Sequence, residues 1–433
     1  MIDIVGAAIG FAIMLGLMVL GVHVAVSIFL VSILGALVYL GPALINTFGT
    51  QLWSVMNDFI LTAIPLFILL GELLLRSGIT QRMYHGLSSW LWRLPGGLLH
   101  TNIAASAMFA AVSGSSVATA ATISTVALPE LKERKYNERL VLGSIAAGST
   151  LGILIPPSVN LIIYGALTNT SIGHLFAAGI VPGLLLASLF MLAIIVICTF
   201  YPKFSGNAME RPSWAKKMES LRHLIPPMSI FVVVMGSIYL GWATPTEAAA
   251  VGVIMAFGLA ASNRALTFTM LHEAFISTVR TTAMILLIII AAFYLQFIIG
   301  ILGVPQAMTA FVAQMDLSVL GFILALIIFY LILGCFIETL SMMVGTIPIV
   351  FPVVVFMGID PVWFGIFLVL MMELALITPP VGMNLFVVQS VRRTGPVTDV
   401  FVGVLPFILV VLLTVALIIA FPAIVTWLPY KLL

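Results

Sequence analysis

The sequence predicts an all-α polytopic membrane protein, and three observations lead to that fold class. Hydrophobic residues make up 62% of the 433 residues and charged residues only 7%, whereas soluble domains carry about 25% charged residues. The mean hydropathy is +1.27. The two halves also repeat one interrupted apolar pattern, IPPSVNL at 155–161 and TPPVGMNL at 378–385.

The membrane spans follow from the apolar runs, because about 20 apolar residues suffice to cross a bilayer. Residues 1–21 have neither a basic region nor a small-residue cleavage site, so we expect a retained first span rather than a removed signal. The net charge of +2 gives no reason to expect nucleic acid as a partner. Spans or broken spans are expected at 3–21, 24–41, 58–75, 140–166, 174–200, 225–241, 247–263, 281–302, 361–390 and 400–428.

Two further segments are predicted to form re-entrant helical hairpins, which enter and leave the membrane on one side. Residues 97–129 are too few for two crossings and a turn, which need about 40 residues, and basic residues flank both ends. Residues 318–357 occupy the matching place in the second half, although two short crossings remain an alternative there. An arm helix is expected before each hairpin, at 80–95 and at 303–317, and the first carries interfacial tryptophans.

The distribution of basic residues predicts the orientation in the membrane. With this span count, every Lys and Arg except Lys431 falls on the cytoplasmic side, as the positive-inside rule requires. Both termini are therefore expected on the periplasmic side.

The two halves are predicted to form an inverted repeat, residues 1–223 and 224–433. An offset of about 223 residues brings Pro129 onto Pro352 and the first Pro-Pro pair onto the second. An odd number of crossings separates equivalent points, so the halves have opposite orientations and one hairpin opens from each side. In transporters, broken helices at matching places of two such halves form the binding site near the membrane midplane.

Each Pro-Pro pair is expected to break its helix inside the membrane. The pair removes two backbone donors and blocks the preceding turn, so we expect no continuous helix through it. The freed carbonyls cost several kcal/mol in hydrocarbon unless an ion, water or protein satisfies them. Helix ends before the breaks would offer carbonyls to Na⁺, and helix starts after them would favour an anion. Asn160 and Asn384 either bind ligands or merely cap the broken backbone.

The hairpin tips supply the other polar groups. The first tip reads VSGSSVATAATIST from Val112, and its hydroxyls offer neutral oxygens to a hard cation or a carboxylate. Plain helix packing is the alternative role for these small residues. A carboxylate within a span costs about 2.5–3.5 kcal/mol, so Glu338 in the second tip and Glu373 are either functional groups or satisfied structural acids.

These features define the predicted site. The substrate is expected to contact Ser115, Ser116, Thr119, Pro157, Asn160, Glu338, Pro380 and Asn384. The Na⁺ ligands are expected among Ser113, Gly114, Gly152, Pro156, Thr339, Ile377, Thr378 and Pro379. No cofactor and no enzyme activity are expected, because the six His residues form no metal-ligand pair. An intramembrane hydrolase using the VSGSS serines would need a His beside them to activate the hydroxyl.

Long segments of the chain resemble one transporter family. They are LPELKERKYNERL at 128–140, GSIAAGSTLGILIPPSVNLIIYG at 143–165, GWATPTEAAAVG at 241–252 and GIDPVWFGIFLVLMMELALITPPVGMNLFVV at 358–388. On these segments the chain resembles, from end to end, the large membrane subunit of a TRAP (tripartite ATP-independent periplasmic) transporter.

The resemblance implies an elevator-type secondary importer of organic acids in the bacterial-type inner membrane, driven by a Na⁺ gradient. It implies a small four-helix membrane subunit, expected as a separate polypeptide, and a soluble periplasmic substrate-binding protein. The hairpin tips and Pro-Pro loops would form the sites, although many members carry Asp in place of Glu338. H⁺ as the main coupling ion remains an alternative, and so does a stand-alone symporter of di- or tricarboxylates that needs no partner subunits.

Overall fold

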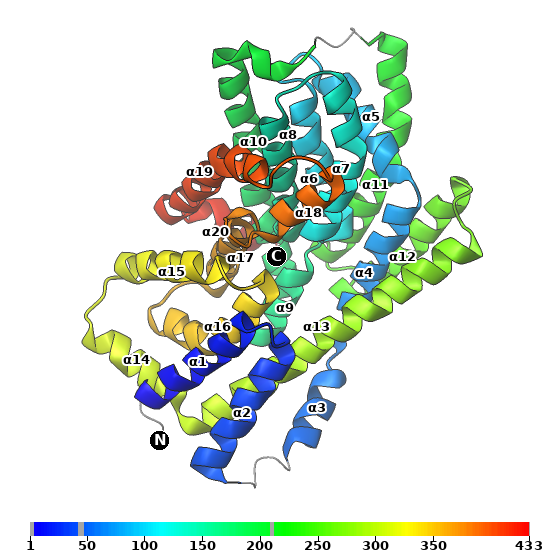
Figure 1. The fold of residues 1–433 in the computed structure, drawn as a ribbon. Coiled ribbons are helices and arrows are strands. Elements are labelled where there is room, and N and C mark those ends of the chain that lie inside the picture. The colour runs from blue at the N-terminus through cyan, green and yellow to red at the C-terminus, as the bar shows by residue number, and fades with distance from the viewer. Residues whose placement is uncertain (1–3, 42–46, 208–211, 433) are drawn as a thin grey trace.

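The computed structural model describes residues 4–41, 47–207 and 212–432, and every regular element in that part of the chain is a helix (Figure 1). Arg211, in the predicted cytoplasmic linker, lies outside the described residues. The first half holds α1 (Ile4–Val19), α2 (Val24–Leu40), α3 (Phe48–Met56), η2 (Phe59–Thr62), α4 (Ala63–Arg76), α5 (Ile79–Leu91), α6 (Leu98–Ser113), α7 (Ser116–Glu133), α8 (Glu138–Thr150), η3 (Leu151–Ile153), α9 (Val159–Thr168), α10 (Ile172–Phe200) and η4 (Pro202–Ser205).

The second half repeats the alternation of long and short helices. It holds α11 (Trp214–Tyr239), α12 (Pro245–Ser262), α13 (Phe268–Leu302), α14 (Val304–Gln314), α15 (Val319–Gly334), α16 (Thr339–Phe356), α17 (Pro361–Ile377), α18 (Met383–Arg392), α19 (Thr398–Ala420) and α20 (Ala423–Leu432). Seven of the described helices, with η2 and α4 counted as one, are long and apolar enough to cross a membrane. The all-helical, multi-span class is therefore confirmed.

The predicted arms and hairpins correspond to separate helices. α5 and α14 occupy the arm segments, and the pairs α6–α7 and α15–α16 occupy the hairpin segments. The second helices of both pairs contain 18 residues, and their N-caps, Ser115 and Glu338, lie 223 positions apart. The N-caps of α8 and α17, Asn137 and Asp360, have the same separation.

Three span boundaries differ from the sequence prediction. α13 starts at Phe268 rather than at 281, because no Gly or Pro lies between these two positions and the charged Glu273 there pairs with Arg76. The predicted span 400–428 is two helices, α19 and α20, which Pro422 separates by lacking a backbone donor. The predicted span 225–241 belongs to α11, which begins earlier, at Trp214.

α11 also corrects the rule that no helix continues through a Pro-Pro pair. Pro226 and Pro227 both lie inside it. The carbonyls that they leave unpaired belong to Arg222 and His223, at the charged end of the helix, where water is available. A Pro-Pro pair therefore breaks a helix only where the surroundings do not satisfy the freed carbonyls.

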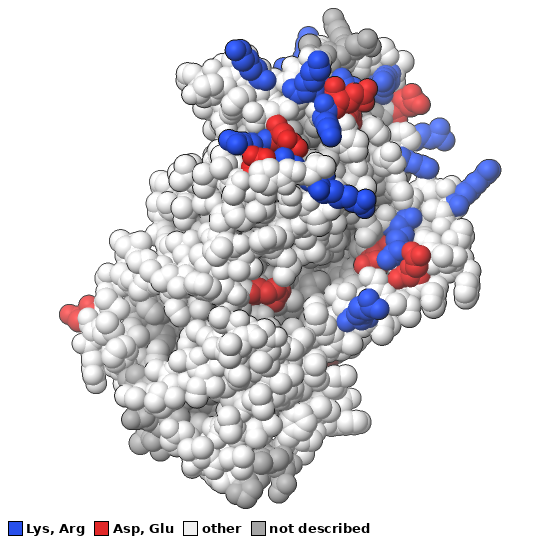
Figure 2. Space-filling view, in the orientation of Figure 1, with Lys and Arg blue, Asp and Glu red and all other residues white. Residues whose placement is uncertain are grey.

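Packing gathers the helices into two groups. α8 lies between α6, α7, α18 and α19, and α10 packs on α19 and α20. α4 packs on α12 and α13, and α13 packs on α2. In Figure 1 the first group fills one end of the molecule, whereas α1, α2 and α13 extend to the other. Figure 2 shows Lys and Arg over one half of this face and almost none over the other half.

Candidate functional site

The first hairpin turns within two residues. α6 ends at Ser113, Gly114 takes a left-handed conformation with φ of 60°, and the Ser115 hydroxyl accepts a hydrogen bond from the backbone N–H of Ala118. The Thr119 hydroxyl, fully buried, donates to the Ser115 carbonyl at 2.6 Å and lies 3.3 Å from the Ser113 hydroxyl. The tip is therefore a closed cluster of hydroxyls around one turn.

This tip lies directly on the first Pro-Pro break. A Cβ atom added at Gly114 would lie 2.7 Å from the Pro157 carbonyl oxygen, and one at Gly152 would lie 2.9 Å from the Ser115 backbone. Glycine is needed at both positions because only its backbone allows this approach. The break itself is buried throughout, and α9 restarts after Ser158, whose hydroxyl donates to the Ile153 carbonyl at 2.6 Å.

The second tip lies on the second break in the same way. Gly334, at the end of α15, touches Ala375 of α17, and the Cys335 thiol is 3.7 Å from the Pro379 carbonyl oxygen. Glu338 caps α16 by accepting from the backbone N–H groups of Leu340 and Ser341 at 3.2 Å. In contrast to the first break, Pro380 is exposed, so the second loop is the more accessible one.

Asn384 connects the two halves. Its Nδ2 atom donates to the Ser116 hydroxyl at 2.8 Å and to the Ala146 carbonyl oxygen at 3.2 Å. The side chain is fully buried, and its Oδ1 atom has no hydrogen-bond partner among the described residues. The first turn after the second break is therefore bonded to the first hairpin tip and to α8.

The two predicted asparagines differ in their surroundings. Asn160 is 6% exposed, in the first turn of α9, and its amide makes no hydrogen bond to another described residue. Asn384 uses both of its donor hydrogens inside the protein. Asn160 consequently keeps its full donor and acceptor capacity for a ligand, whereas Asn384 keeps only its oxygen.

The predicted residues thus fall into two adjoining clusters. The first contains Ser113, Gly114, Ser115, Ser116, Thr119, Gly152, Pro157 and Asn384, which the contacts above bring together. The second surrounds the other tip and break and contains Glu338, Thr339, Thr378, Pro379 and Pro380. Pro156 and Asn160 lie beside the first cluster, on the break and in α9, and Ile377 is the last residue of α17.

The sequence reasoning missed the backbone and capping partners. Neither the Ala146 carbonyl nor Ser158 was predicted, although a Ser directly after a Pro-Pro pair is a typical N-cap signal. For Glu373 the sequence left two alternatives, a functional group or a satisfied structural acid. It lies fully buried in α17 one turn before the second break, beside Thr150, and neither carboxyl oxygen has a hydrogen-bond partner among the described residues.

The first cluster offers neutral oxygens and amides, and the second adds the Glu338 carboxylate. No Lys, Arg or His makes a contact with the tip hydroxyls among the described residues, and these residues contain no group of three His, Cys, Asp or Glu side chains that could hold a metal. Hydroxyls and carbonyls suit a hard cation such as Na⁺, and amide donors suit a carboxylate. The serines of the first tip bond to Ala118 and Asn384 rather than to a His, which a nucleophilic serine would need.

The tips and breaks are closely packed in this conformation. Two apolar cavities of about 250 and 320 Å³ lie between α1 and the helices around it. A polar cavity of about 700 Å³ lies between α5 and α7. None of these three cavities is lined by a residue of either tip or either break.

Comparison with known proteins gives a consistent match. The family model described as "Tripartite ATP-independent periplasmic transporter, DctM component" matches residues 11–424. The chain is 34% identical to the C4-dicarboxylate TRAP transporter large permease protein of Rhodobacter capsulatus, covering 98% of each chain. It is 34% identical to the sialic acid large permease of Vibrio cholerae, covering 96% of each, and 30% identical to the ectoine large permease of Halomonas elongata, covering 96% and 97%.

A solved structure supports the fold. The YdaH transporter of Alcanivorax borkumensis superposes with a TM-score of 0.59 over 90% of this chain and 88% of that chain. Its sequence identity is 14%, so this similarity concerns the fold alone.

Proposed function

The chain belongs to the large permease (DctM) family of tripartite ATP-independent periplasmic transporters, and from this premise we propose that it is the transport subunit of a Na⁺-coupled importer of organic acid anions. It is a multi-pass inner-membrane protein. The observation that carries the proposal is the bond from Asn384 to Ser116, because it joins a broken helix of one half to the hairpin tip of the other.

The proposed substrate class follows from the site and from the names of the relatives. Those names include C4-dicarboxylate, sialic acid and ectoine, all of which contain a carboxyl group. A carboxylate would be bound by the Asn160 amide and by the backbone N–H groups of Val159 and Asn160 at the N-terminal end of α9; the N–H of Leu161 is already bonded to the Ser158 hydroxyl. Na⁺ would be held by hydroxyls and carbonyls of the tips and breaks, where it would neutralise the substrate charge.

We propose an inverted repeat as the architecture behind this site. The caps Ser115 and Glu338, the caps Asn137 and Asp360 and the two Pro-Pro breaks all lie 223 positions apart, which supports it. With basic residues on the cytoplasmic side, the two hairpins would open from opposite sides and both termini would lie in the periplasm.

Movement is proposed to follow the elevator mechanism, in which one block carries the site across the membrane. In this proposal the block contains the hairpins and the broken helices. The packing favours adding α10, α19 and α20, because α19 lies tightly on α8 and α10 packs on α19. α1–α4 and α11–α13 would form the scaffold.

Two partners are proposed, a small four-helix membrane subunit and a soluble periplasmic binding protein. The isethionate permease DctMQ of Oleidesulfovibrio alaskensis supports the first, because it is a fusion of which this chain covers only 64%. The scaffold helices expose large apolar side chains, among them Val38 in α2 and Ile254 in α12, that lipid or a membrane subunit would cover.

Uptake in proteoliposomes tests the proposal. We expect accumulation of a labelled organic acid only when the small subunit and the substrate-loaded binding protein are present and Na⁺ is higher outside. Uptake that is equally fast without the binding protein would favour the stand-alone symporter. Uptake that responds to a pH gradient but not to Na⁺ would favour H⁺ as the coupling ion.

A further inference from the structure

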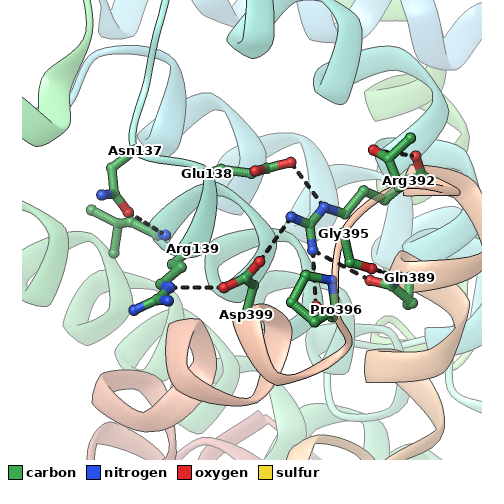
Figure 3. A network of polar contacts seen from close by, with 10 residues as sticks. Asn137, Glu138, Arg139, Gln389, Arg392, Gly395, Pro396 and Asp399 are labelled. Atoms are coloured by element: carbon green, nitrogen blue, oxygen red, sulfur yellow. Dashed lines mark hydrogen bonds and ion pairs between the residues drawn. The ribbon is translucent and has the colours of Figure 1, made fainter.

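A buried arginine lies at the end of α18 that is remote from the second Pro-Pro break. Arg392, the last residue of α18, has a side chain that is only 6% exposed. Its Nε atom donates to Glu138 at the start of α8 at 2.8 Å, and its Nη2 atom donates to Asp399 of α19 at 3.0 Å (Figure 3). One guanidinium therefore joins three helices from both halves of the chain.

The remaining groups of this cluster fix the guanidinium further. Its Nη1 atom donates to the Pro396 carbonyl oxygen at 3.1 Å. The second oxygen of Asp399 accepts from Nε of Arg139 at 2.9 Å, so this carboxylate is held from two sides (Figure 3). A planar guanidinium with donors on all three nitrogens has one orientation that satisfies every partner, which a flexible ammonium cannot reproduce.

The orientation of Arg392 affects the placement of Asn384, because α18 is bonded to α8 at both of its ends. Asn384 in its first turn reaches the Ala146 carbonyl, and Arg392 in its last turn reaches Glu138. Both pairs of anchor points are eight residues apart, about 12 Å along each helix. The two helices thus run side by side in opposite directions, and the anchor at one end limits rotation and sliding at the other.

We propose that Arg392 is a positioning residue for the substrate and ion site: it sets the placement of Asn384 against Ser116 without touching a ligand. The inference rests on the proposed function, in which that contact belongs to the site. Loss of the arginine anchor should let α18 rotate and weaken the bond between Asn384 and Ser116. Binding should then suffer more than the maximal rate.

The test compares Arg392→Gln with Arg393→Gln in the complete transporter. Arg393 is the adjacent residue, exposed and without an ion pair among the described residues, so its replacement matches the charge change. We expect Arg392→Gln to raise the half-saturating Na⁺ and substrate concentrations about tenfold, the scale of a charged hydrogen bond, with a much smaller change in maximal rate. Arg393→Gln should leave both constants unchanged.

A second measurement does not depend on transport. Amide hydrogen exchange of the purified variants should become faster in Arg392→Gln at Met383–Leu385, the end of α18 remote from the substitution, and remain unchanged in Arg393→Gln. Slow exchange at that end in both variants, or an equal loss of maximal rate without a change in half-saturation, would overturn the proposal. If wild-type uptake does not need Na⁺, the proposed coupling fails, while exchange and substrate half-saturation still decide the role of Arg392.

Discussion

At the residue scale, the two asparagines that follow the Pro-Pro breaks differ in the hydrogen bonds of their side chains. Asn384 donates its amide hydrogens to the buried Ser116 hydroxyl and to the buried Ala146 carbonyl oxygen. Asn160 makes no such bond among the described residues. The same motif therefore supplies one asparagine that links helices of the two halves and another whose amide remains available to a ligand in the proposed site.

Alanine substitutions should distinguish an effect on stability, at Asn384, from an effect on uptake, at Asn160. Asn384→Ala leaves a buried carbonyl and hydroxyl without their donor, so we expect a loss of about 1–3 kcal/mol of unfolding free energy. Asn160→Ala removes no internal hydrogen bond and should change stability by less than about 0.5 kcal/mol, yet reduce uptake. Thermal unfolding in detergent, measured with uptake, checks both; equal destabilisation of the two variants would contradict the assignment.

Glu338 provides a second prediction at this scale. Its carboxylate accepts from two backbone N–H groups of α16 and from the Ser341 hydroxyl at 2.9 Å, which satisfies an acid placed within an apolar hairpin. Glu338→Ala should cost about 0.5–2 kcal/mol, the usual value of an N-cap, whereas Glu338→Asp should retain the cap and most of the stability. If Glu338→Asp keeps stability but abolishes uptake, the carboxylate also contacts the substrate or the ion.

Sequence patterns indicate where the breaks and tips lie, but they do not indicate which distant residues contact them. Pro, Gly, Ser and Asn at a break or tip can be recognised in the sequence because each of them favours a particular local backbone conformation. The Ala146 carbonyl and the Glu138–Arg392 pair could not be found in this way, because their partners are more than 200 residues away and every residue has a carbonyl. The burial of Glu373 likewise depends on which face of α17 meets α8.

At the element scale, helix ends lie within a few residues of the predicted arm, hairpin and break segments, since turns and apolar lengths are local properties; the re-entrant course of the hairpins stays a prediction. The crossing of α8 and α19 could not be predicted in this way. There Gly143 and Gly403 face each other so closely that a Cβ on Gly143 would collide with the Gly403 carbonyl oxygen. Small residues allow such close helix contact in membranes, but glycine is common in apolar segments and does not indicate which helix it meets.

Gly143→Ala tests this crossing. The added methyl group would force the two backbones apart, and we expect a loss of about 3 kcal/mol or more, with little folded protein recovered. Gly258→Ala is the matched control, because a Cβ at that position of α12 meets nothing within 4 Å. Monodispersity on size exclusion and the unfolding temperature give the comparison; comparable behaviour of the two variants would show that α8 and α19 can separate without cost.

At the scale of the whole molecule, the sequence predicted a multi-span helical protein with polar and broken segments, whereas the division into a moving block and a scaffold stays a proposal. Membership of a block depends on which faces pack together. The contacts of α19 with α8 and of Asp399 with Arg139 and Arg392 are the features that favour placing α19 in the proposed block.

The boundary between block and scaffold can be tested by reversible cross-linking. Gly71 of α4 faces the first hairpin tip, and a Cβ at Gly71 would lie 3.1 Å from the Cα atom of Ser113. Within the block, a Cβ at Gly148 would lie 3.3 Å from the Cα atom of Ile103. After replacement of the native Cys198 and Cys335, each pair can be changed to cysteine and oxidised, because in both pairs the two backbones lie in contact.

We expect the Gly71→Cys/Ser113→Cys disulfide to stop uptake, since it would link the tip, part of the proposed block, to a helix of the proposed scaffold, and reductant to restore the rate of the reduced double variant. The Gly148→Cys/Ile103→Cys disulfide joins two helices of the proposed block, so oxidation should leave uptake near its reduced rate. Each reduced variant serves as its own reference, which separates the effect of the bond from that of the substitutions. Continued uptake with the first disulfide fully formed would mean that the hairpin does not slide past α4, and the site would then have to open by local movement of the tips.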